Sequence, residues 1–126
     1  AASMRYLRDA SALIKDDGLP EQTLRRILPG MLRMALESAC RERYFTRQLE
    51  LGKRHLDLEN EWSDAHLTSA RLQLAIEQSR DVWLRPEYRR KALGVCTIGF
   101  HNALKGDLET ALHWVTRTVD DIKQGR

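Results

Sequence analysis

Turn-forming residues and cysteines are scarce in this chain of 126 residues. It has 7 glycines and 3 prolines, too few for the repeated tight turns of a small β-sandwich or β-barrel. Its two cysteines, Cys40 and Cys96, are far apart in the sequence, so no closely spaced pair supports a zinc site. The composition therefore favours an all-α fold in which both thiols are reduced and buried.

The chain also lacks a long apolar run and a secretory signal. Its longest apolar stretches fall far short of the ~20 residues that a membrane-spanning helix needs. We therefore expect a cytoplasmic protein with no membrane partner. Residues 1–3 resemble the remnant of a tag, and this beginning favours a domain excised from a larger protein. We expect one helical domain over residues 4–126, which is long enough to bury a hydrophobic core.

Neither sign of charge dominates. The net charge is +3, with 42% hydrophobic and 31% charged residues, which is an ordinary globular balance. A basic surplus attracts phosphate backbones, but three charges are too few to diagnose nucleic-acid binding.

Apolar residues recur at helical spacing through most of the chain. The prolines and glycines divide this pattern, and Pro29 with Gly30 predicts a kink or a break in the longest segment. Asp107 is predicted to cap the last helix. The result is an antiparallel bundle of about five helices, predicted over residues 4–15, 23–51, 65–78, 86–104 and 108–122. Residues 53–63 are compatible with either a loop or a short helix.

In the fourth of these helices, Gly94 and Gly99 are costly, by ~1 kcal/mol each relative to alanine. We expect them to allow close approach of a neighbouring helix. Phe100 is expected beside the buried stripe of the same helix.

Arginines form the main polar constellations. Arg33, Glu37 and Arg41 are spaced by four residues and share one helix face, and Arg89 with Arg90 belongs to a second basic run. These faces are either solvated and braced by ion pairs, or binding surfaces for phosphate, RNA, DNA or an acidic partner.

No constellation typical of catalysis is present. The chain has no Gly-rich phosphate loop and no Gly-x-Ser-x-Gly turn. His55 and Glu59 have the spacing of a helical pair, but no His-Glu-x-x-His motif supports a metal site. His101 near a predicted helix end is typical of a structural side chain. We therefore expect no catalytic residue, metal or cofactor.

The run from Leu28 to Arg41 resembles the start of the α-helical C-terminal region of bacterial AAA/SMC-like ATPases, which often occur in defence-associated gene clusters. The last part of the chain is also similar to the end of that region. It contains Gly99-Phe100-His101-Asn102, then Gly106-Asp107-Leu108 and a final amphipathic helix. This resemblance implies a helical appendage to an ATPase core.

The helical layout is also similar to HEPN domains, which dimerise and often cleave RNA. Their active members carry an arginine that is separated from a histidine by four to six intervening residues on one helix. The positions before His101 that would correspond are Gly94, Val95 and Cys96, so the resemblance implies an inactive relative in which His101 and Asn102 are the remnant.

These observations predict a non-catalytic module for self-association, as a homodimer, or for docking to an ATPase or effector. A HEPN-like domain that binds or cleaves RNA is the first alternative. A nucleic-acid-binding module using the arginine-rich faces is the second.

Overall fold

The computed structural model describes residues 1–126 and contains seven α-helices and no strand. They are α1 (Ala2–Ile14), α2 (Glu21–Glu50), α3 (His55–Asp64), α4 (Thr68–Ala75), α5 (Arg80–Trp83), α6 (Glu87–Cys96) and α7 (Leu108–Gln124). The all-α prediction is confirmed. The helices outnumber the five predicted because α3 and α5 lie in segments too short for a clear apolar period.

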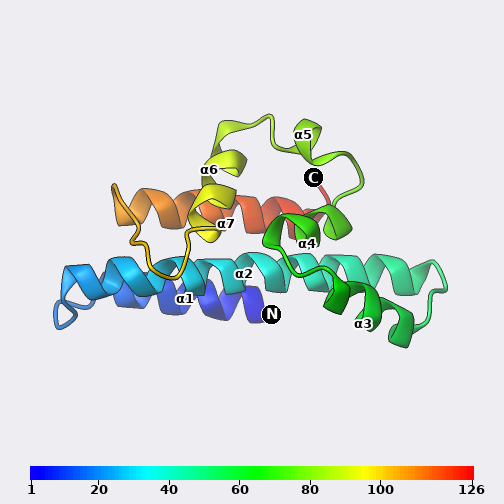
Figure 1. Cartoon of the computed structure of the whole chain (residues 1–126), viewed down its shortest axis with the longest axis horizontal. Helices are drawn as coiled ribbons and strands as arrows, with labels where there is room; N and C mark the ends of the chain where they lie inside the picture. The colour runs from blue at the N-terminus through cyan, green and yellow to red at the C-terminus, as the bar shows by residue number, and fades with distance from the viewer.

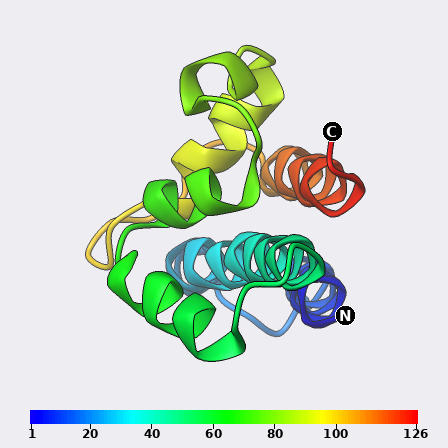
Figure 2. The same ribbon diagram turned by 90° about the vertical axis from the view of Figure 1, so that its right-hand side faces the viewer.

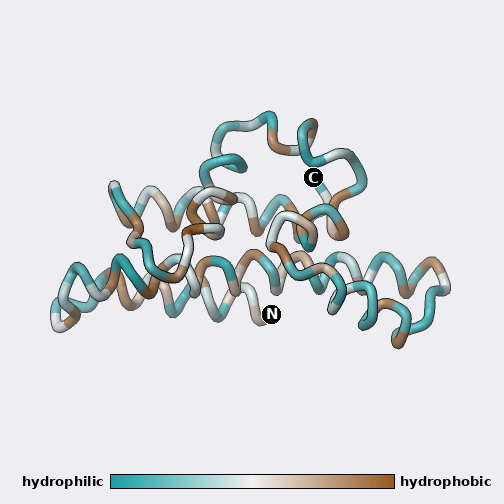
Figure 3. The backbone as a smooth tube through the Cα atoms, in the orientation of Figure 1, coloured by the Kyte–Doolittle hydropathy of each residue, from teal (hydrophilic) through white to brown (hydrophobic).

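The long helix α2 is the centre of the fold. It runs the length of the molecule, with α1 along its first half and α3 beneath its second half (Figure 1). Seen along its axis, α2 lies between α1 and α3 on one side and α4, α6 and α7 on the other (Figure 2), and it contacts all five. Along α2 and α7 hydrophobic and hydrophilic residues alternate within the turns (Figure 3), as in amphipathic helices.

The helix directions depart from a regular up-and-down bundle. The chain reverses between α1 and α2, which form an antiparallel pair (Figure 1). The first turns of α2 contact the start of α7, since Arg25 bonds to the carbonyl of Gly106 at 2.8 Å. The last turns of α2 contact the end of α7, where Arg43 lies against Gly125. The two longest helices are therefore parallel, joined by the intervening helices.

Pro29 lies inside α2 without ending it. A proline lacks the N–H that would bond to the carbonyl four residues earlier, which here belongs to Arg25. That carbonyl accepts the backbone N–H of Leu104 at 2.8 Å, and the Arg25 guanidinium donates to the carbonyl of Leu104 at 3.0 Å. The acceptor freed by the proline thus anchors the segment before α7.

Removing the Arg25 side chain should loosen this anchor. We expect Arg25→Ala to lower the free energy of unfolding by about 2 kcal/mol, because the partly buried guanidinium makes charge-assisted bonds to two carbonyls. Amide hydrogen exchange should accelerate first at Leu104. The neighbouring Arg26 is exposed and makes no such bond, so Arg26→Ala is the matched control. An equal loss of stability in both variants would contradict the anchor.

The first helix begins at Ala2, and Ser3 is fully buried. The close approach predicted at Gly94 and Gly99 is wrong. A Cβ at Gly94 would meet nothing within 4 Å, and one at Gly99 would meet only the Asn102 side chain.

The helix predicted over 86–104 ends early, because α6 stops at Cys96. The Thr97 hydroxyl donates to the carbonyl of Leu93 at 2.8 Å, and the chain then leaves the helix axis. Residues 97–107 form an irregular segment in which Phe100 is 95% exposed. The prediction that Phe100 lies beside a buried stripe is therefore wrong.

The last helix follows its prediction closely. Asp107 accepts the backbone N–H of Thr110 at 2.9 Å, which confirms the cap and lowers the pKa of its carboxyl, chiefly through the hydrogen bonds from Thr110. The helix buries a regular apolar stripe, to which Ala111, Val115, Val119 and Ile122 belong.

Both thiols are buried and unpaired, as predicted. Burial raises the pKa of Cys40 and of Cys96, and the nearby carboxylate of Glu37 adds to both shifts.

None of the seven helices combines the length and the apolar composition needed to cross a lipid bilayer.

Candidate interaction surface

A groove of about 780 Å³ lies over the first half of α2. One wall is α1 and the other is the irregular segment before α7. We call it the α2 groove, and its lining residues are Tyr6, Asp9, Arg26, Ile27, Gly30, Met31, Arg33, Met34, Phe100 and His101.

The floor of the α2 groove is apolar and partly exposed. Ile27, Met31 and Met34 are spaced by four and three residues, so they form one stripe along α2. Ile27 is 42% and Met34 is 45% exposed. Phe100 adds a ring whose only aromatic neighbour is the imidazole of His101, at 5.5 Å between centroids. A contiguous exposed apolar stripe of this kind is typical of a protein-binding surface.

Two arginines flank this floor. Arg26 and Arg33 are exposed, and neither has a hydrogen bond or an ion pair within the chain. Asp9 is the only carboxylate among the lining residues. The rim of the α2 groove therefore carries a positive surplus that nothing in this chain neutralises.

The apolar surface continues toward α4. A second hollow of about 540 Å³ shares Arg33 and Met34 with the α2 groove and reaches Leu67 and Thr68. Leu67 is 69% exposed. The two hollows together give an elongated surface, which suits a helical or extended segment better than a compact small molecule.

The predicted arginine ladder does not form. Glu37 accepts hydrogen bonds from Thr68 at 2.9 Å and from Arg71 at 2.5 Å, and thereby fastens α4 to α2. Arg41 bonds to Glu59 of α3 and lies 4.2 Å from the centroid of the Phe45 ring. Arg33 is the only one of the three predicted residues whose charged end remains free.

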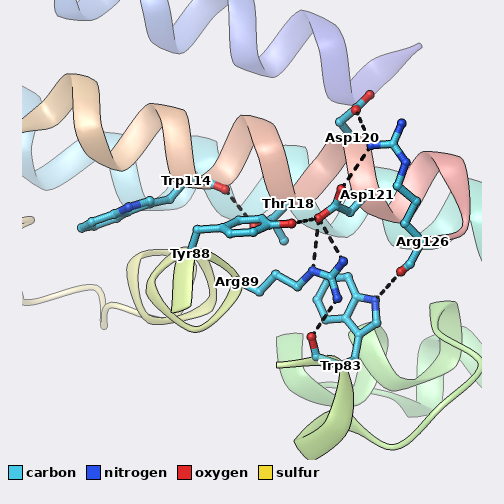
Figure 4. Close-up of polar contacts among 8 residues, drawn as sticks. All are labelled: Trp83, Tyr88, Arg89, Trp114, Thr118, Asp120, Asp121 and Arg126. Atoms are coloured by element: carbon cyan, nitrogen blue, oxygen red, sulfur yellow. Dashed lines mark hydrogen bonds and ion pairs between the residues drawn. The ribbon is translucent and has the colours of Figure 1, made fainter. Parts of the chain in front are cut away.

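Arg89 belongs to a buried network centred on Asp121 of α7. Its guanidinium lies 3.1 Å from the Asp121 carboxylate, donates to the carbonyl of Trp83 at 2.9 Å and stacks on the Trp83 ring (Figure 4). The Tyr88 hydroxyl donates to the same carboxylate. Arg126 pairs with its other oxygen at 3.5 Å. This network joins α5, α6 and α7, and it commits all three nitrogens of the Arg89 guanidinium to contacts within the chain.

The remaining predicted residues are exposed. Arg90 donates to the carbonyls of Leu84 and Arg85, at 2.9 and 2.5 Å, so it completes the end of α5. His101 lines the α2 groove and Asn102 lies beside it, in the irregular segment and not on a helix. The helical arginine–histidine arrangement of active HEPN domains therefore has no counterpart here.

The histidines do not converge with other metal ligands. His55 lies 3.8 Å from the Glu59 carboxylate, and no group of three His, Cys, Asp or Glu side chains meets at one point.

Comparison with protein-family models, with curated proteins and with solved structures found no match for this chain. The structure alone therefore directs the choice of site. It selects Ile27, Met34 and Phe100, none of which was a site residue predicted from the sequence. The sequence of α2 contained a signal for exposed apolar residues, since its apolar stripe is wider than one neighbouring helix can cover.

Proposed function

We propose that this protein is a non-catalytic helical interaction module whose α2 groove docks an acidic amphipathic helix of a partner protein. The observation that carries the proposal is an unpartnered apolar stripe on α2 with the unpaired Arg26 and Arg33 at its rim. A helix laid in such a groove buries its apolar face, and its carboxylates pair with the arginines. An ATPase or effector subunit is the kind of partner that the sequence resemblance implies.

A second copy of the chain fits the α2 groove less well. Two-fold contacts place the same surface against itself, so the apolar stripes would meet but the uncompensated arginines would face like charges. This argument favours a different protein with carboxylates at the positions that the arginines reach.

The test uses two synthetic helical peptides that share leucines at positions i, i+3, i+4 and i+7. One carries glutamates on its other faces and the other carries lysines. We expect the acidic peptide to bind, and Met34→Asp to weaken its binding by about tenfold or more, because a carboxylate on the floor of the groove is desolvated beside apolar surface. Titration calorimetry measures the affinities.

Leu49→Asp is the matched control, because Leu49 is 43% exposed on the same helix but outside the α2 groove. It should bind the peptide like the unaltered protein. Equal affinity for the acidic and basic peptides would overturn the proposal. So would a wild-type dimer, seen by light scattering, that Met34→Asp dissociates, because the occupant would then be a second copy.

RNA binding is the second candidate, and one observation favours it. The α2 groove brings His101 together with Arg26 and Arg33, although no arginine precedes His101 on a helix. A short single-stranded RNA is the probe. Charge reversal at Arg33 should then lower the affinity and flatten its salt dependence, whereas reversal at Arg89 would disrupt the Asp121 network and report on folding instead.

A further inference from the structure

A separate pocket of about 280 Å³ opens where the last turns of α2 meet the end of α7. It lies far along α2 from the groove, and the two share no residue. Three guanidinium groups line it, from Arg43 and Arg47 of α2 and from Arg126. Glu77, Asp121 and the ring of Trp83 complete its polar and aromatic lining.

Arg43 is the unusual member of this pocket. Its side chain is 30% exposed, yet it makes no hydrogen bond, and its Nε is buried without a partner. Its nearest carboxylate oxygen is on Glu77, at 3.8 Å from Nη2. Buried donors on charged groups are normally satisfied, because leaving one unpaired costs free energy. Nε itself is covered, so an acceptor from outside the chain would have to meet this guanidinium at its terminal Nη groups.

Gly125 leaves room for Arg43. A Cβ at residue 125 would lie 2.5 Å from Nη2 of Arg43, so a larger residue there would displace the guanidinium from the end of α7. Gly125 also has the left-handed φ of 71° that glycine tolerates best. The glycine thus allows the unsatisfied donors of Arg43 to lie at the pocket.

The charges around the pocket favour an anion. Glu77 is shared between Arg43 and Arg47, at 3.8 and 3.4 Å. Asp121 is already engaged by Arg89, Tyr88 and Arg126. Neither carboxylate supplies the two oxygens that a guanidinium fork prefers, so Arg43 retains most of its capacity to bind.

We infer that the Arg43 pocket binds a phosphate group. Phosphate presents several strong acceptor oxygens, which suits the guanidinium of Arg43, the one without a hydrogen bond. Arg47 bonds to the carbonyls of Leu74 and Ala75. Arg126 pairs with Asp120 and Asp121, so these two guanidinium groups contribute mainly positive charge to the pocket. The volume is about nine times the ~30 Å³ that one water molecule occupies, so it accommodates a small phosphate monoester as well as inorganic phosphate.

The experiment titrates the full chain with inorganic phosphate, ribose 5-phosphate and acetate at constant ionic strength. NMR signals of the Arg43 Nε–H and the Trp83 indole report binding. We expect saturable shifts with both phosphates in the millimolar range or below and none with acetate. Tighter binding of ribose 5-phosphate would identify a monoester as the ligand, and equal binding would identify the free ion.

Two substitutions should move the affinity in opposite directions. Arg43→Gln should weaken phosphate binding about tenfold or more, since it removes a charge-assisted pair. Glu77→Gln should strengthen it, because the competing carboxylate is removed from an exposed position. Arg8→Gln, on the exposed face of α1, changes the net charge equally and should leave the affinity unchanged. The absence of saturable shifts, or weakening by Arg8→Gln equal to that by Arg43→Gln, would overturn the inference.

Discussion

Asp121→Asn is expected to lower the free energy of unfolding by about 3–5 kcal/mol, the usual consequence of removing one partner from a buried ion pair. The side chain of Asp121 is 6% exposed and that of Arg89 is 12% exposed. Without the carboxylate, the buried charge of Arg89 has no counter-ion, and the Tyr88 hydroxyl loses a charged acceptor. Urea denaturation followed by circular dichroism measures the change.

The neighbouring residue supplies the control. Asp120 is 56% exposed and pairs only with Arg126, itself 61% exposed. Asp120→Asn should therefore change stability by about 0.5 kcal/mol or less. The double variant Asp121→Asn with Arg89→Met should recover part of the loss, because it removes the uncompensated charge. Similar losses at residues 120 and 121 would show that Asp121 is not the centre of the network.

Thiol reactivity is the second prediction with a large expected effect. Cys40 and Cys96 should react with a disulfide reagent at least about a hundredfold more slowly in the folded protein than in denaturant, because reaction requires the thiolate and access to it. Burial lowers the thiolate fraction, because it raises the pKa of each thiol. It also blocks access of the reagent, because both sulfurs are covered. Absorbance of the released thiol follows the reaction.

The same assay gives an internal check on the first prediction. If the thiols are reached only through unfolding, Asp121→Asn should accelerate both of them and Asp120→Asn should not. Single Cys40→Ala and Cys96→Ala variants separate the two rates. Rapid modification of one thiol in the native protein would show that its helix opens locally without the rest of the fold.

The elements predicted best are those whose local and tertiary preferences agree. In α7 the cap at Asp107 and the apolar stripe both specify the same helix, and both are observed. In α2 the local signal at Pro29 specified a kink or a break. The helix does not break there, and the freed carbonyl of Arg25 accepts the Leu104 N–H. A long-range donor of this kind leaves no trace in local spacing.

The candidate sites were less predictable for the same reason. Arg89 carries a local pattern of exposed charge, and its buried partner lies 32 residues away on α7. Phe100 fits a helical stripe, but α6 ends before it and exposes its ring. Arg33 is exposed, and its guanidinium is unpaired because Glu37 bonds to Arg71 instead.

The irregular segment before α7 is held at both ends. Cys96 is fully buried at its start and Leu104 is nearly so at its end, where it is bonded to α2. The entropy of closing the loop of seven residues between them is therefore lost on folding and not on association. A partner that binds Phe100 would have to order this loop but not to bring its ends together, which lowers the entropic cost of binding.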